Sequence, residues 1–259
     1  MTLRKHQALA VDGALQVLEQ QYTEGSRLDV LEVGGGSRTK IDLPGTRIVS
    51  LDIDGDSLAR SAYAEQRIVG DAQSYDFAGK SFDIAVFWNV LEHIPDPQMA
   101  LRNVASCVAP AGSIVVAGPL LGSLKGIVTR VTPHWVHVLY FRVIAGKKDA
   151  GTPGQGPFKV EHHKGCDIDE LVDSLKTLDF DVSFRREYRG VQLAQLNEFS
   201  RLLYGVYRLG SWALRRASRG KLGSVESDFI LVARRRSHAH LARKRQETTR
   251  TAYAVRAEA

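Results

Sequence analysis

Short apolar runs recur at regular intervals through the first half of the chain, and they predict buried β-strands. These runs occupy residues 28–33, 47–52, 66–70, 83–88 and 113–118. Helix-like segments separate them at 56–65 and 97–109, and Asp96 and Pro97 suit the cap and first position of the second segment. Strands that alternate with helices in this way are typical of a parallel sheet with right-handed crossovers.

Further elements are expected on both sides of this alternation. Residues 6–22 carry apolar side chains near helical spacing, so a helix should pack ahead of the first strand. The later part of the chain predicts a helix at 167–178, a strand at 180–186, a helical stretch at 194–217 and a last strand from 228. We therefore expect an α/β, Rossmann-like doubly wound sheet of about seven strands, mostly parallel, with an antiparallel last strand.

The regular alternation stops between residues 119 and 165, where glycine and proline are frequent. A long irregular segment inside an α/β domain is usually an active-site lid or a disordered insertion. Because this segment follows the fifth strand, it starts at the carboxyl end of the sheet, where ligands bind. We expect a lid insertion here, with 119–165 and 194–217 together forming the acceptor-binding elements.

Composition narrows the class of protein. The 259 residues are 44% hydrophobic, which excludes wholesale disorder, and the two cysteines, Cys107 and Cys166, cannot form a disulfide framework. The amino-terminal residues lack the apolar core of a signal peptide, and no run of 18 apolar residues occurs. A cytoplasmic location is expected.

The net charge of +6 belongs to the end of the chain. Residues 234–259 hold eight basic and two acidic side chains, whereas residues 1–233 hold 27 of each. We expect one domain over 1–233 and a basic, mobile tail over 234–259. A solvated tail without a function is favoured, and nucleic acid or anionic lipid remains a possible partner.

A glycine run and one acid point to a nucleoside-bearing cofactor. Gly34, Gly35 and Gly36 directly follow the first strand, where the absence of a Cβ permits a sharp turn close to a ligand. Asp52 ends the second strand, where a carboxylate can accept both hydroxyls of a ribose. Only about ten residues separate Gly36 from the second strand, so a phosphate-binding helix has little room.

Several later motifs identify a family. They are Gly70-Asp71-Ala72, Ser81-Phe82-Asp83, the segment NVLEHIPDP at 89–97, and Pro110-Ala111-Gly112. In this order and spacing, the sequence closely resembles the class I S-adenosylmethionine-dependent methyltransferases of the small-molecule branch called type 11. The resemblance covers residues 28–118 and extends weakly, from His163, to about residue 184. Arg38 stands where the family pattern has its last glycine.

The resemblance implies a set of cofactor-binding residues at the carboxyl ends of the strands. Glu32 would orient the amino group, and Asp52 would hold the ribose hydroxyls. Asp71 would accept a hydrogen bond from the adenine amino group. The full set is Glu32, Gly34, Gly35, Gly36, Asp52, Ile53 on the adenine face, Asp71, Ala72 and Asn89. Carboxylates and carbonyls suit a cationic ligand rich in hydrogen-bond donors.

Transfer to a hydroxyl needs a base, because a neutral alcohol is a poor nucleophile. Of the four histidines in the irregular segment, His134 and His137 are our candidates, ahead of His162 and His163. The alternative is that they cap or pack within the lid. Glu92 and His93 resemble part of a metal site in ubiquinone-pathway methyltransferases, but without a clear third ligand a structural role is favoured, and no metal is expected.

The helical stretch at 199–216 interleaves apolar and aromatic side chains with arginines. It predicts either a cover helix or a surface for a membrane or a lipid-linked substrate. We expect methylation of a hydroxyl on a sugar or glycolipid-like molecule. Alternatives are a quinol or natural-product methyltransferase, an RNA methyltransferase that uses the tail, and a non-enzymatic binding protein. A nicotinamide oxidoreductase is disfavoured because Thr39 breaks the dinucleotide glycine pattern.

Overall fold

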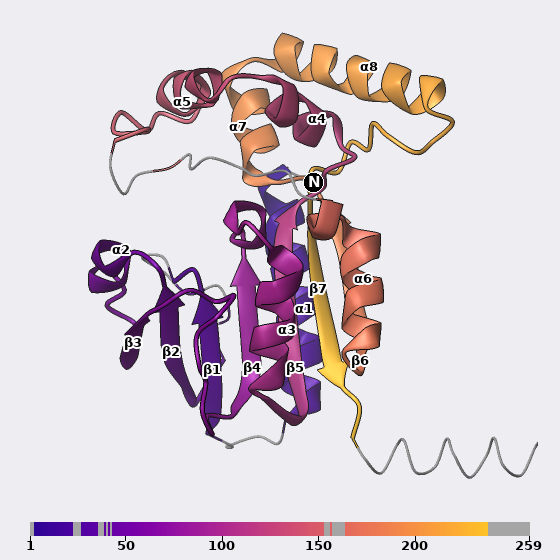
Figure 1. The fold of residues 1–259 in the computed structure, drawn as a ribbon. Coiled ribbons are helices and arrows are strands. Elements are labelled where there is room, and N and C mark those ends of the chain that lie inside the picture. Colours follow the sequence, from indigo (N-terminus) through magenta and orange to yellow (C-terminus); the bar gives the residue numbers. More distant parts are fainter. Residues whose placement is uncertain are drawn as a thin grey trace, which may run out of the picture.

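The protein is built on one seven-stranded sheet, seen in a computed structural model that describes residues 3–22, 27–35, 39, 41, 43–152, 156 and 164–237. The strands lie in the order β3-β2-β1-β4-β5-β7-β6 (Figure 1). They are β1 Leu28–Val33, β2 Thr46–Asp52, β3 Gln66–Val69, β4 Phe82–Trp88, β5 Val108–Pro119, β6 Phe180–Tyr188 and β7 Asp228–Arg235. Strands β1 to β5 pair in parallel and β7 is antiparallel to both of its neighbours, which confirms the predicted fold class.

The helices follow the predicted alternation with three differences, the first of which is that the segment 119–165, expected to be irregular, contains two helices. They are α1 Leu3–Gln21, α2 Gly55–Ala59, α3 Pro97–Ser106, α4 Leu124–Val131, α5 His134–Val143, α6 Ile168–Thr177, α7 Val191–Phe199 and α8 Arg201–Ala217, with short 3-10 turns η1 Leu91–His93 and η2 Lys164–Cys166. Helix α2 is half as long as predicted. The stretch expected as one helix at 194–217 is two, because Ser200 has an extended backbone and its hydroxyl caps α8 by accepting from Leu203 N.

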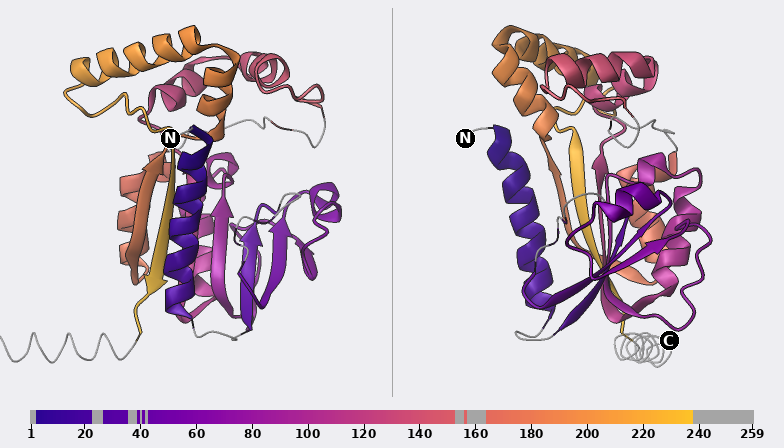
Figure 2. Two further views of the ribbon diagram at one scale, coloured as in Figure 1. Left: turned by 180° about the vertical axis from the view of Figure 1, so that it is seen from behind. Right: turned by 90° about the vertical axis from the view of Figure 1, so that its left-hand side faces the viewer.

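Helices cover both faces of the sheet, which explains why its strands read as nearly continuous apolar runs. On one face α1 lies over β6 and β7 (Figure 2) and buries Ala10, Ala14 and Leu18 in a cluster with alternate residues of the strands. On the other face α3 and α6 bury a second cluster that includes Leu101 and Leu171. Because side chains alternate along a strand, every strand except β3 supplies residues to both clusters.

Four helices form a separate layer beyond the carboxyl ends of the central strands. Helices α4, α5, α7 and α8 make up this layer, which we call the cap (Figure 1). The predicted lid segment supplies α4 and α5, and the stretch after β6 supplies α7 and α8. The cap stands over the edge of the sheet at which β1, β2 and β4 end.

The sheet extends into residues 234–259, the segment that we expected to be a tail. Strand β7 continues to Arg235, and the side chains of Arg234 and Arg235 donate to the carbonyls of Ala111 and Val108. The first two residues of the expected tail therefore belong to the sheet, and residues 238–259 lie outside the described part of the chain. Within the residues that the structure describes, no helix combines the length and apolar character needed to span a membrane.

Candidate functional site

Four parallel strands end at one level and bring the predicted cofactor residues to a common edge. Val33 pairs with Leu51 on one side and with Phe87 on the other, so β1, β2 and β4 stop together. Asp52 in turn pairs with Val69 of β3. The residues that follow these strand ends occur where an α/β sheet usually binds its ligand. They are Gly34 and Gly35 after β1, Ile53 after β2, Asp71 and Ala72 after β3, and Asn89 after β4.

The turn after β1 requires glycine at two successive positions. Gly34 has a φ of +71°, its N–H donates to Leu51 O at 2.8 Å, and an added Cβ would lie 2.4 Å from Cγ2 of Val90. A Cβ on Gly35 would lie 1.6 Å from Oγ of Ser50. The glycines thus allow the turn to pack directly against β2 and the segment after β4. Gly36 and Arg38 lie outside the described residues, as do His162 and His163.

Glu32 lies one residue before the end of β1 and is buried. Tyr63, from the loop after α2, is its neighbour: burial, and to a smaller extent the Glu32 carboxylate, raise the pKa of the tyrosine to about 12. Tyr63 also lies near the glycine turn, with its hydroxyl 3.5 Å from the position of a Cβ on Gly35. Glu32 therefore places an acid beneath the turn, next to a phenol that stays protonated at neutral pH.

Asp52 and Ile53 form the end of β2 and have opposite surroundings. The Asp52 carboxyl is half-buried, accepts from Asp54 N at 2.9 Å, and has a pKa raised by burial. The Ile53 side chain is 74% exposed, although it is large and apolar. A carboxylate beside an uncovered apolar surface fits a ribose hydroxyl pair and an adenine face, so this strand end suits the implied cofactor.

The turn at Asp71 contains Gln73, a side chain that no pattern in the sequence singles out. The Gln73 amide donates to both Asp71 oxygens at 2.9 and 3.0 Å, and its Oε1 accepts from Asp96 N at 2.9 Å. Gln73 N also donates to Asp71 at 2.9 Å. One amide therefore links the predicted adenine site to the start of α3. The neighbouring Ala72 is buried, and its carbonyl accepts from Asn103.

Asn89 directly follows the last residue of β4. Its φ is +52°, in the left-handed region that few residues other than glycine adopt, and its N–H donates to Ala117 O at 2.8 Å. This conformation turns the chain sharply from β4 into η1. The position of Asn89 beside the cofactor stays a prediction.

A buried charged cluster joins the cap to the sheet. Lys125 of α4 donates to both oxygens of Asp228, the first residue of β7, at 2.8 and 2.9 Å. Glu92 of η1 is also buried, and its charge interacts with both of them. Burial is the main cause that raises the pKa of Glu92 to about 7. Sequence reasoning missed Lys125 and Asp228, because a single lysine and an acid 103 residues away show no local pattern.

The raised pKa of Glu92 predicts a fall in stability as the pH rises from about 4.5 to about 7. Over this range the unfolded chain releases a proton that the folded chain keeps, so the loss should reach about 3 kcal/mol. Glu92→Gln removes this titration and should flatten the dependence in urea unfolding at about pH 5 and about pH 8. Replacing the exposed Glu19 by Gln should leave the pH dependence of stability unchanged. If the free energy of unfolding changed with pH by the same amount in Glu92→Gln and in the natural protein, the prediction would be wrong.

The two candidate bases lie on α5 in the cap. Their rings have centroids 6.2 Å apart, and Nε2 of His137 lies 2.7 Å from Oγ1 of Thr132. Thr132 Oγ1 in turn donates to Val128 O at 2.7 Å. The contact with Thr132 orients the ring of His137. Among the described residues, no group of three or more His, Cys, Asp or Glu could hold a metal ion.

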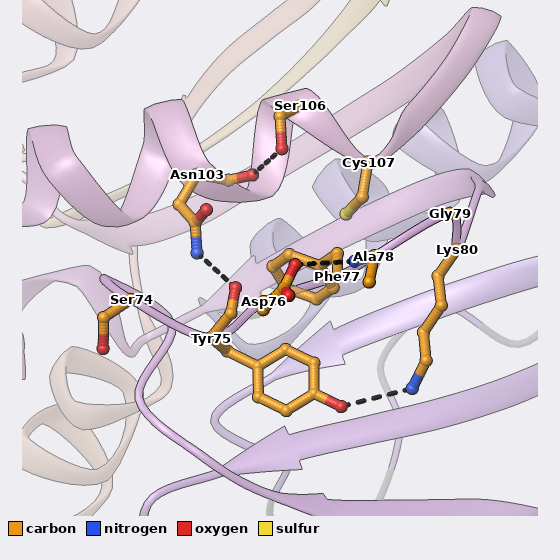
Figure 3. Close-up of a pocket in the computed structure, with 10 residues that line it drawn as sticks. All are labelled: Ser74, Tyr75, Asp76, Phe77, Ala78, Gly79, Lys80, Asn103, Ser106 and Cys107. Atoms are coloured by element: carbon orange, nitrogen blue, oxygen red, sulfur yellow. Dashed lines mark hydrogen bonds between the residues drawn. The ribbon is translucent and has the colours of Figure 1, made fainter.

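A hollow of about 350 Å³ lies away from this edge (Figure 3). It is formed by residues 74–80 together with Asn103, Ser106 and Cys107 at the end of α3. Lys80 crosses it to reach the hydroxyl of Tyr75 at 3.2 Å, and the Asn103 amide donates to the Tyr75 carbonyl. None of the residues predicted to bind the cofactor or to act as a base lines this hollow.

Comparison with known families and structures agrees with the geometry of the edge. A family model described as a methyltransferase domain matches residues 4–182. This match spans more than half of the chain, from α1 to the first residues of β6. A search of curated proteins returns no match.

Solved structures share the fold at low sequence identity. A putative sarcosine dimethylglycine methyltransferase from Galdieria sulphuraria is 13% identical, with a TM-score of 0.55 over 90% of this chain and 88% of that one. An S-adenosylmethionine-dependent methyltransferase from Methanosarcina mazei is 16% identical, with a TM-score of 0.51 over 86% and 98%. The [4+2]-cyclase SpnF is 15% identical, with a TM-score of 0.52 over 87% and 81%. Such likenesses establish the fold, on which different reactions occur.

Proposed function

Because the chain belongs to the methyltransferase domain family and is an S-adenosylmethionine-dependent methyltransferase, we propose that it methylates a hydroxyl of a sugar or glycolipid-like small molecule. This proposal rests on the aromatic and basic side chains of the cap. Trp135 and Tyr140 lie on α5, in the layer over the strand ends that carry the predicted cofactor residues, among basic side chains. Aromatic faces stack on sugar rings, and arginines suit acceptors with anionic groups.

The cofactor would be held by the residues at the strand ends. Asp52 would accept the ribose hydroxyls, Ile53 would cover the adenine, and Glu32 would orient the amino group. Gly34 and Asn89 would let the backbone approach the ligand closely. When bound, S-adenosylmethionine supplies an electrophilic methyl group on a sulfonium. The protein must then place the acceptor and accept its proton.

His137 is the better placed of the two candidate bases, because Thr132 fixes the orientation of its ring. Its imidazole would take the proton of the acceptor hydroxyl, and the hydrogen bond to Thr132 would stabilise the resulting imidazolium. His134, on the exposed side of α5, is the second candidate. This proposal gives the cap a chemical role in addition to enclosing the acceptor.

Replacing the base by alanine should lower kcat by roughly a hundredfold or more, while the affinity for S-adenosylhomocysteine stays unchanged. His137→Ala and His134→Ala would be measured separately, with initial rates for turnover and calorimetry for binding. Thr132→Val should have a smaller effect and should shift the pH profile of kcat, since it removes only the hydrogen bond to His137. His6→Ala, on α1, is the control. Full activity in both cap variants would reject a histidine base.

A labelled-methyl screen tests the acceptor class. Sugars and glycolipids should become labelled, and quinols, other natural products and RNA represent the alternative acceptors. Labelling of RNA, lost on removal of the basic residues 238–259, would favour the nucleic-acid alternative instead. A glycolipid-like acceptor also implies that a cytoplasmic enzyme contacts an anionic membrane peripherally, so the location of the protein belongs to the same proposal.

A further inference from the structure

Helix α8 has two faces that differ sharply in burial. Tyr204 and Ser211 are buried, with Tyr207 and Leu214 half-buried between and beyond them, and this face packs on the protein. At 100° per residue, another set of side chains lies on the opposite side of the helix. It comprises Leu202, Val206, Leu209 and Trp212, each at least 60% exposed. A row of four large apolar side chains without cover is unusual on a soluble domain and marks an interaction surface.

An arginine row borders this apolar face. Arg201, Arg208 and Arg215 are seven residues apart, so they lie on one line along the helix. All three are exposed, as are Arg216 and Arg219 at the carboxyl end of the helix. Apolar side chains flanked by guanidinium groups are the pattern of a helix that lies in the plane of a lipid interface.

Helices α4, α5 and α8 carry no acidic side chain, and α7 carries one, Glu198. Residues 120–148 and 199–225 hold eleven lysines and arginines and no aspartate or glutamate. The remainder of residues 1–233 holds 16 basic and 27 acidic residues, so the cap is cationic and the sheet domain beneath it anionic. Helix α5, in the same layer, exposes Trp135, Leu139 and Val143 at four-residue spacing. Charge and apolar exposure therefore coincide in one layer.

We propose that the outer face of α8 docks on a membrane that contains anionic lipids, with the apolar row at the acyl boundary and the arginines at the headgroups. A second copy of the chain fits less well, because a twofold contact through this face would bring the two arginine rows together. RNA would use the arginines but would leave the leucines and valine exposed. The inference depends on the surface of α8 and holds whichever acceptor the enzyme uses.

Vesicle flotation of the full chain tests the proposal. We expect binding to vesicles of phosphatidylcholine mixed with phosphatidylglycerol, weaker binding to phosphatidylcholine alone, and loss of binding at high salt. Arg208→Gln with Arg215→Gln should weaken binding by roughly fivefold for each arginine. Leu202→Ser with Leu209→Ser should weaken it by roughly tenfold or more in total. Because all four side chains are exposed, thermal unfolding and affinity for S-adenosylhomocysteine should not change.

A matched control lies on α3, where Met99 and Arg102 are also exposed. Met99→Ser with Arg102→Gln should bind vesicles as the natural protein does, and residues 238–259 are common to all variants. Absence of vesicle binding, equal binding to both vesicle types, or binding that survives both α8 variants would overturn the proposal. A dimer in light scattering that Leu202→Ser with Leu209→Ser converts to a monomer would assign the face to a second copy. A failed acceptor screen would leave these results unaffected.

Discussion

Replacing Asp52 by alanine is expected to weaken the binding of S-adenosylhomocysteine by roughly a hundredfold or more. Hydrogen bonds to a charged group contribute about 1.5–3 kcal/mol each, and the carboxylate would accept two from the ribose. The half-buried position of Asp52 at the end of β2 adds to the effect, because water replaces the lost acceptor poorly there. Isothermal titration calorimetry on the purified protein measures the change directly.

Two further variants separate this role from a general loss of charge. Asp56→Ala removes an exposed acid four residues away in α2 and should leave affinity unchanged. Asp52→Asn keeps an acceptor oxygen and should bind with intermediate affinity. Near-normal affinity in Asp52→Ala would show that other residues hold the ribose. This result would not change the family or the fold.

Gly35→Ala should lower the free energy of unfolding by about 3 kcal/mol and abolish cofactor binding. The new methyl group would lie 1.6 Å from Oγ of Ser50, which is fully buried in β2, so the turn and the strand must separate. Urea unfolding measures the loss of stability. Gly205→Ala is the control, because no atom lies within 4 Å of its new Cβ and alanine favours the helix.

Ser50→Ala should rescue much of the Gly35→Ala defect. The second change removes the clashing oxygen and leaves the Ser50 Cβ at 2.9 Å from the new methyl group, a far smaller overlap. The two substitutions should therefore be strongly non-additive in a double-mutant cycle. Additive losses would mean that the turn is strained by something other than this contact.

The strands of the sheet could be predicted from sequence to within a residue or two where they are buried on both faces, as β1, β2 and β4 are. Prediction failed where distant residues decide the local structure. Helix α2 ends at Ala59, and the buried Ser61 that follows donates to the Gly35 carbonyl and accepts from Arg67. Neither contact can be read from the helical pattern.

The same distinction applies to the site. Glu32, Gly34 and Asp52 could be expected at one edge, because the carboxyl ends of neighbouring parallel strands meet there. The Gln73 bridge to Asp96 spans 23 residues and depends on how two turns face each other. A side-chain amide in a turn has no pattern that reveals such a partner. The roles of His134 and His137 stay predictions for similar reasons, since the orientation of α5 follows from contacts such as Tyr140 to Gln192.

The ion pair between Lys125 and Asp228 limits how the cap can open. Lys125 donates to both carboxylate oxygens of Asp228, and Ser227 and Gln192 add further hydrogen bonds to the pair, so we expect α4 to stay joined to β7 during turnover. Helix α5 has no buried residue, so we expect its movement to cost less. We therefore expect the cap to open by movement of α5 while α4 stays in place. Acceptor entry and product release should take place at the α5 side, and their rates should depend on the contacts of that helix.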